Sequence, residues 1–82
     1  MGEDLLKYKY IPTQTTLADD KFYRTSWGVA LVETSGDIAV VIDEYSDISQ
    51  NIEDITNLVR LCNEMELDKS HFADVVEDFL AK

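Results

Sequence analysis

The chain has 82 residues, of which 7 are Lys or Arg and 17 are Asp or Glu, and its formal net charge at pH 7 is −10. This length predicts one small domain, residues 1–82, with a modest core. The charge argues against direct binding to nucleic acid or to an anionic membrane, where Lys and Arg must neutralise phosphate. One Cys and one His exclude an intramolecular disulfide and a structural zinc site.

No apolar run approaches the roughly 20 residues of a membrane span, and the first residues lack the basic and apolar regions of a signal peptide. We therefore expect a cytoplasmic protein. Residues 43–82 carry eleven of the acidic residues but only three basic ones. Most of the negative charge therefore belongs to the C-terminal half.

The first apolar alternation is Leu6, Tyr8 and Tyr10, separated by lysines, which predicts a half-buried strand over residues 6–11. Pro12 either ends this strand or places it at a sheet edge. The polar segment Thr13–Asp20 has no period and predicts a connection, with a turn at its last two residues.

A β-hairpin is predicted next. Phe22–Glu33 and Ile38–Asp43 are rich in β-branched and aromatic residues, and they flank the linker Thr34–Asp37, which contains Gly and Asp. Alternation predicts that one face packs on the core through Trp27, Val29, Leu31, Ile38, Val40 and Ile42. The opposite face would present the small apolar residues Gly28, Ala30, Val32, Ala39 and Val41.

That small apolar face is a candidate dimer face, because apolar patches on soluble proteins often mark interfaces. Two arrangements would cover it: a homodimer or a protein partner, or the connection Thr13–Asp20 folded over it.

The hydrophobic period changes to that of a helix after Tyr45. The first apolar stripe predicts a helix over about Gln50–Met65, with Ser49 or Asn51 as the N-cap, and contains Ile52, Ile55, Leu58, Val59, Cys62 and Met65. The second stripe contains Phe72, Val75, Val76, Phe79 and Leu80, with Asp68 as the N-cap and Leu67 placed for a hydrophobic staple with Phe72.

These elements predict an α+β fold in the order β-β-β-α-α. We expect a three-stranded antiparallel sheet over residues 1–45 and an αα-hairpin over residues 49–82, packed on one face of the sheet.

No residue set predicts catalysis, cofactor binding or metal binding. His71 falls in the first turn of the second helix and off its apolar stripe, so we expect a solvated side chain. Cys62 lies on the apolar stripe of the first helix and reads as a small buried hydrophobe. The acidic segment from Asp43 to Asp54 is a poor calcium loop, because Tyr45 and Ile48 stand where an oxygen ligand and a glycine are needed.

The second helix has an unusual charge pattern. Asp74, Glu77 and Asp78 lie in its C-terminal half, where the helix dipole favours cations, and Asp74 and Asp78 form a like-charge i, i+4 pair. Helix stability does not explain these charges. They are either a solvated face that keeps the protein soluble or a candidate surface for a basic partner.

Several short strings resemble a family of small bacterial proteins of unknown function: Ile48-Ser49, Leu58–Asn63, Leu67, His71 and Asp74–Leu80. In that family an aromatic-Gly pair, here Trp27-Gly28, begins a hairpin, and two short helices end the chain. The resemblance covers Trp27 to Leu80. It implies a bacterial cytoplasmic setting and no activity, so no functional residue is carried over.

The sequence therefore favours a non-enzymatic interaction or regulatory module that binds a protein partner through the acidic helical face, the apolar sheet face or both. An acidic nucleic-acid mimic or antitoxin-like inhibitor of a basic protein is the alternative. A small enzyme subunit using His71 with Asp68 or Asp74 is a third interpretation, and a DNA-reading helix pair is rejected because the second helix would repel phosphate.

Overall fold

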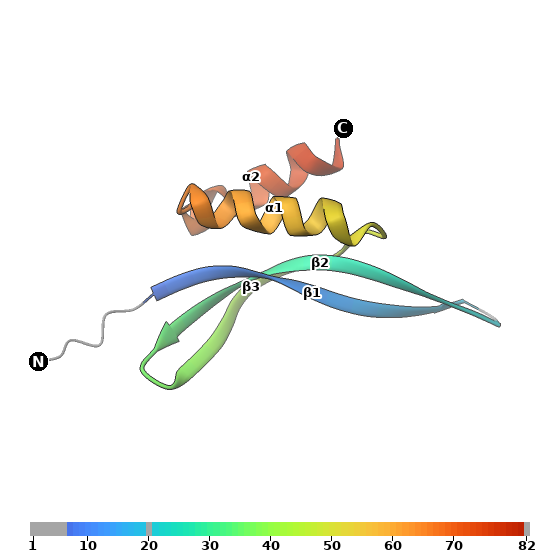
Figure 1. Ribbon diagram of the computed structural model, residues 1–82, viewed down its shortest axis with the longest axis horizontal. Coiled ribbons are helices and arrows are strands. Elements are labelled where there is room, and N and C mark those ends of the chain that lie inside the picture. Colours follow the sequence, from blue (N-terminus) through green and yellow to red (C-terminus); the bar gives the residue numbers. More distant parts are fainter. Residues whose placement is uncertain (1–6, 20, 82) are drawn as a thin grey trace, which may run out of the picture.

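The structure is a computed structural model that describes residues 7–19 and 21–81. The elements, in chain order, are β1 (Lys7–Asp19), β2 (Phe22–Ser35), β3 (Ile38–Ser49), α1 (Ile52–Glu64) and α2 (Lys69–Leu80). The strands form one antiparallel sheet in the order β1-β2-β3, and both helices lie on the same side of it (Figure 1). The predicted α+β fold is confirmed.

The first strand is twice as long as the sequence indicated. Thr13 to Asp19 continue β1 and pair with β2, so the predicted connection is wrong. Pro12 is tolerated inside the strand because β1 is an edge strand, where a missing N–H costs no ladder bond. Beyond Pro12 the strand contains Thr13, Thr15 and Thr16, whose branched side chains favour extended backbone.

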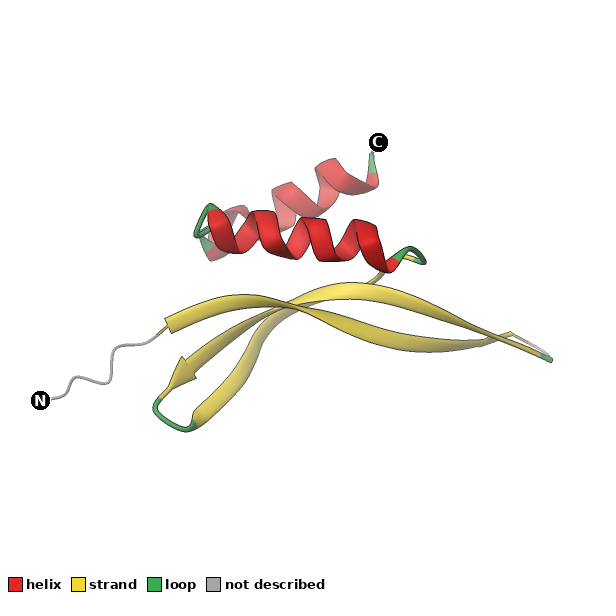
Figure 2. Cartoon of the chain, in the orientation of Figure 1, coloured by secondary structure: helices red, strands yellow, loops and turns green. Residues whose placement is uncertain are grey.

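The predicted turn at Asp19-Asp20 falls partly on residue 20, which lies outside the described residues. Asp19 pairs with Phe22, so the connection between β1 and β2 is limited to residues 20 and 21. The two strands form a long two-stranded arm that extends past the helices at the right of Figure 2.

The second hairpin is confirmed, with a turn shorter than the predicted linker. Ser35 pairs with Ile38, which leaves Gly36 and Asp37 as a two-residue loop. Gly36 has φ 60°, as the first loop position of a tight hairpin requires. β3 continues to Ser49, so the sheet does not end at residue 45 as predicted.

The register between β2 and β3 is interrupted twice. Leu31 pairs with Asp43 but Val32 pairs with Val41, so Ile42 is the extra residue of a β-bulge. A second irregularity lies between Trp27 and Val29, where β3 contains Asp47 at φ 56°.

Both helix N-caps are the predicted residues. The Asn51 side chain accepts a hydrogen bond from the N–H of Glu53 at the start of α1, and the Asp68 carboxylate accepts one from the N–H of Ser70 at the start of α2. Each bond satisfies an N–H that the helix itself leaves free. Within the described residues, no helix is long and apolar enough to cross a membrane.

The core lies between the helices and the middle of the sheet. The buried cluster consists of Tyr10, Val29, Leu31, Ile55, Leu58, Val59, Cys62, Phe72 and Val76. Phe72 is fully buried and packs edge-on against Tyr10 and Tyr45, with 4.9 Å between ring centroids in each pair. One helical aromatic residue thus joins the first and third strands.

The predicted core face is correct at Val29 and Leu31 and wrong at Ile38 and Val40, which are 66% and 49% exposed. The reason is length. A helix of 13 residues, such as α1, spans about 20 Å, whereas a strand of 14 residues, such as β2, spans about 46 Å. The helices therefore cover only the middle of the sheet, and both hairpin ends project beyond them (Figure 1).

Candidate functional site

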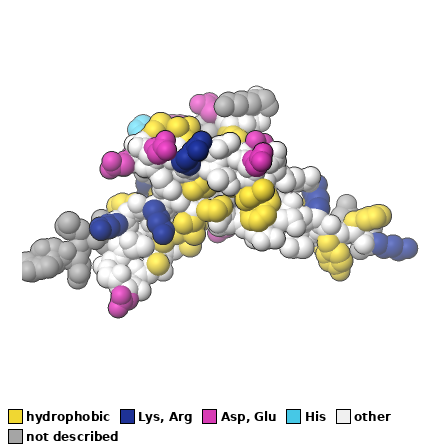
Figure 3. All heavy atoms as spheres, viewed as in Figure 1, with side chains coloured by type: hydrophobic (Ala, Val, Ile, Leu, Met, Phe, Trp, Pro, Cys, Tyr) yellow, Lys and Arg dark blue, Asp and Glu magenta, His cyan; other side chains and the backbone are white. Residues whose placement is uncertain are grey.

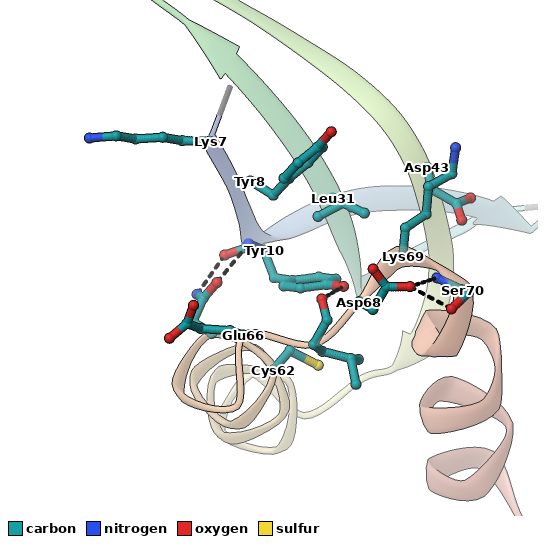
Figure 4. Close-up of a pocket in the computed structure, with 12 residues that line it drawn as sticks. Lys7, Tyr8, Tyr10, Leu31, Asp43, Cys62, Glu66, Asp68, Lys69 and Ser70 are labelled. Atoms are coloured by element: carbon teal, nitrogen blue, oxygen red, sulfur yellow. Dashed lines mark hydrogen bonds between the residues drawn. The ribbon is translucent and has the colours of Figure 1, made fainter. Parts of the chain in front are cut away.

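A groove lies where the turn between α1 and α2 meets the sheet. It has a volume of about 830 Å³ and is lined by Lys7, Tyr8, Tyr10, Leu31, Asp43, Cys62, Asn63, Glu66, Leu67, Asp68, Lys69 and Ser70. Figure 4 shows sheet residues on one side and the helix-helix turn on the other. Charges of both signs line the groove.

Tyr10 fixes the helix-helix turn to the sheet. Its hydroxyl donates a hydrogen bond of 2.7 Å to the carbonyl of Leu67. Its backbone N–H donates to Asn63 Oδ1 at 2.8 Å, and its carbonyl accepts from Asn63 Nδ2 at 2.9 Å (Figure 4). The Asn63 side chain therefore bonds β1 as a neighbouring strand would.

The buried ionisable groups of the groove stay in their neutral forms. Burial is the chief cause that raises the pKa of Tyr10 to about 12. Burial also raises the pKa of the Cys62 thiol, which is fully inaccessible. The prediction that Cys62 is a buried hydrophobe is confirmed, and its thiolate is disfavoured as a nucleophile.

His71 is exposed in the first turn of α2, as predicted. Nearby Asp68 accepts hydrogen bonds from the hydroxyl and N–H of Ser70, which lower the pKa of its carboxyl. Among the described residues, no hydrogen bond joins the His71 ring to Asp68 or Asp74. The interpretation of His71 as a catalytic residue therefore stays a prediction.

The acidic residues predicted as a partner surface, Asp74, Glu77 and Asp78, are all exposed on α2. In the view of Figure 3, acidic side chains gather over the helical layer, and most of the basic ones lie toward the two ends of the sheet. The structure brings the three acids to one helix, and their binding to a partner stays a prediction.

The candidate dimer face is not one open patch. Gly28, Ala30 and Val32 are buried within the single chain, whereas Ala39 and Val41 are exposed. A Cβ built on Gly28 would clash with the Tyr45 carbonyl oxygen, so the backbone of β3 closes over this position. The flat surface expected from alternation is wrong, because β3 is irregular there. The alternative, in which the connection Thr13–Asp20 folds over this face, is wrong too, because Thr13 to Asp19 are part of strand β1.

The exposed part of that hairpin forms a second candidate site, which we name the open hairpin end: Ile38, Ala39, Val40 and Val41 of β3. Val41 is 53% exposed, close to the 49% of Val40, although the two side chains point to opposite faces. Both faces of this edge segment are therefore apolar and accessible.

The sequence does contain a signal for the open hairpin end. The assignment of alternate residues to two faces of the strand did not use it. Residues 38–42 are all apolar and four of them are β-branched, a pattern of a strand without a polar face. No sequence signal marks Asn63 as a partner of Tyr10, because the two are distant in the chain and Asn63 resembles any exposed polar residue of a helix.

The sheet, helices and groove define a small α+β domain. Residues 2–82 match DUF6514, a family of unknown function, and the chain belongs to this family. The resemblance to an uncharacterised family is thus confirmed, and the match extends beyond Trp27–Leu80 to include β1. No curated protein and no solved structure matches the chain.

Proposed function

We propose that this protein is a non-enzymatic interaction module that binds a protein partner through the open hairpin end. The observation that carries the proposal is the exposure of Ile38, Val40 and Val41 at the start of one edge strand, where they are 66%, 49% and 53% accessible. Ile38 and Val40 lie side by side on one face, and Val41 lies on the other. Single exposed apolar residues are common on soluble proteins, but a contiguous patch marks an interaction surface.

The position of the patch supports the same proposal. The row Tyr8, Glu33 and Val40 continues the helix-facing side of the sheet from Tyr10 and Leu31 toward the hairpin end, and Tyr8 is 55% exposed. The Glu33 carboxylate raises the pKa of the Tyr8 phenol through a hydrogen bond and through its charge. A partner on this face would therefore contact the apolar side chains of Tyr8 and Val40 together with the Glu33 carboxylate between them.

The test is capture of partners from the lysate of the protein's own host by the tagged wild type and two variants. The first variant carries Ile38→Thr and Val40→Thr, which remove apolar surface but keep branched strand-forming side chains. The matched control carries Asp74→Ser, Glu77→Gln and Asp78→Ser on α2. We expect a stoichiometric partner that survives high salt with the wild type and the control and is lost with the hairpin variant.

The opposite result would move the function to the acidic surface. A basic partner that leaves at moderate salt, and that the α2 variant loses while the hairpin variant keeps it, would support the mimic or inhibitor of a basic protein. Light scattering at high micromolar concentration, run on the same variants, identifies a second copy as the partner.

A further inference from the structure

The two edges of the sheet differ in how they are protected against pairing with another strand, and this difference bears on how the open hairpin end binds. Edge strands expose unpaired N–H and C=O groups, which proteins usually block with Pro, Lys, bulges or a covering element. The β1 edge has Pro12, two exposed lysines and the side chain of Asn63 bonded to its backbone. The first residues of β3 show none of them.

The direction of the free backbone groups follows from the bonds of Tyr10. Its N–H and carbonyl point away from β2, toward Asn63. Tyr10 pairs with Leu31, so Leu31 bonds toward β3, and alternation along β2 makes Glu33 and Ser35 do the same. Their partners are Val40 and Ile38. The N–H and carbonyl of the residues between and after them, Ala39 and Val41, therefore point to the open edge.

Among the described residues, no side chain forms a hydrogen bond with the backbone of Ala39 or Val41. The donors and acceptors at this edge are thus exposed to solvent beside apolar side chains. This is the arrangement of a strand that can accept another strand, where backbone bonds provide affinity and alternate side chains provide specificity.

The charges around Ile38–Val41 indicate which kind of partner strand can pair with this edge. Asp37 precedes Ile38 in the turn, and Asp43 and Glu44 follow the apolar residues. A second copy is disfavoured in the antiparallel register that sets Val40 opposite Val40, because this register sets Asp37 opposite Asp43 at both ends. Like charges placed opposite each other destabilise a strand pair, whereas opposite charges stabilise it.

We propose that the β3 edge binds an extended segment of a partner protein by strand addition at Ala39 and Val41, and that this segment has an apolar centre flanked by Lys or Arg. The proposal rests on the proposed function and adds the mode of binding and the chemistry of the partner.

The first test uses a synthetic peptide, KKVTVTVKK, and its acidic counterpart, EEVTVTVEE, each titrated into the ¹⁵N-labelled full chain. We expect the basic peptide to shift the amide signals of Ala39 and Val41, to slow their hydrogen exchange, and to bind at least about tenfold more tightly than the acidic peptide. Equal binding of both peptides, or shifts confined to other residues, would overturn the proposal.

The second test changes the backbone. Ala39→Pro removes one outward N–H without removing a bond to β2, and Ala39→Val is the matched control that keeps the N–H. We expect the Pro variant to weaken binding of the basic peptide at least about tenfold and the Val variant to leave it unchanged. Similar affinities for the two variants would exclude strand addition.

A charge exchange keeps the proposal testable if the Pro variant does not fold. Asp37→Lys with Glu44→Lys should reverse the preference, so that the acidic peptide binds more tightly. An unchanged preference contradicts the proposed partner chemistry. Peptide binding without a partner in the lysate would refute the biological proposal alone, and a lysate partner insensitive to Ala39→Pro would refute strand addition alone.

Discussion

The first and third strands are both edges of one sheet, yet the two edges are protected by different devices. At β1 the amide of Asn63 occupies the N–H and carbonyl of Tyr10, and Pro12, the next residue on the same side, has no N–H to offer. Lys7 and Lys9 are exposed on either side of Tyr8. Pairing with another chain at this edge would have to displace a helix residue and desolvate two charges.

The β3 edge is protected only in its second half. The bulge at Ile42 and the irregularity before Ser49 bend the strand, and Asp43, Glu44 and Asp47 add charge. The residues from Ile38 to Val41 have neither device. The comparison shows that both edges are protected beside the helices, by Asn63 and Pro12 at β1 and by strand irregularity and charge at β3. The unprotected residues lie where β3 projects beyond the helices.

The largest expected effect comes from the residue that holds both edge strands, Phe72. Its ring is fully buried against Tyr10 and Tyr45, so Phe72→Ala leaves a cavity beneath both strands and should lower the free energy of unfolding by about 3–5 kcal/mol. Urea denaturation followed by circular dichroism measures this loss. Phe79→Ala, at a partly buried position of the same helix, is the control and should cost less. Equal losses would mean that Phe72 does not join the two edges.

Removing the seal of the β1 edge should have the next largest effect. Asn63→Ala deletes two hydrogen bonds and leaves the partly buried N–H of Tyr10 without a protein partner, which should cost about 1–3 kcal/mol. Asn57→Ala is the matched control, since Asn57 is exposed on the same helix and, in the described part of the chain, its side chain accepts a hydrogen bond only from Arg60. We expect the control to stay within about 0.5 kcal/mol of the wild type in urea denaturation. A harmless Asn63→Ala would show that the edge needs no seal.

A smaller effect at neutral pH, with a distinct pH dependence, is expected for Tyr10→Phe. The lost hydrogen bond to Leu67 should cost about 1 kcal/mol. The folded pKa of Tyr10, about 12, exceeds the value of 10.0 for a free Tyr, so the unfolded chain releases this proton first. The stabilisation is therefore complete below pH 10 and is lost as the pH rises from about 10 to about 12.

Denaturation series at increasing alkaline pH provide the measurement for this prediction. The wild type should lose stability more steeply than Tyr10→Phe over that interval. Tyr23→Phe is the control, because Tyr23 is 76% exposed and its replacement should leave the wild-type slope intact. A slope that persists in Tyr10→Phe would assign the titration to another group, such as the buried Cys62 thiol.

The sequence predicted the elements whose cause is local. The caps Asn51 and Asp68 and the apolar stripes of both helices depend on spacing within a few residues, and the structure has them where expected. The turn at Gly36 depends on the one residue that accepts positive φ without strain. These features carry the α+β fold.

The errors concern features whose cause is distant in the chain. Thr13–Asp19 forms a strand only because β2 is long enough to pair with it, and Gly28 is buried only because an irregular β3 crosses it. The exposure of Ile38 and Val40 follows from the short helices and not from the alternation of the strand. The candidate site itself could be inferred as an apolar run, but not its orientation. The direction of the free N–H groups depends on the length of the turn, which is two residues closed by Ser35 and Ile38 and not the predicted four.

The smallest expected effect on stability falls on the open edge, where Ile38→Thr with Val40→Thr should change the free energy of unfolding by no more than about 0.5 kcal/mol. The two side chains are largely solvated already, and Thr keeps the strand propensity. Val29→Thr is the control, since it puts a hydroxyl into the fully buried core and should cost about 1–3 kcal/mol. If the hairpin pair proves as costly as Val29→Thr, its apolar residues are there to hold the fold. If the hairpin variant leaves the free energy of unfolding unchanged, the stability of the fold does not explain apolar side chains at a solvated edge. Binding to a partner then explains them.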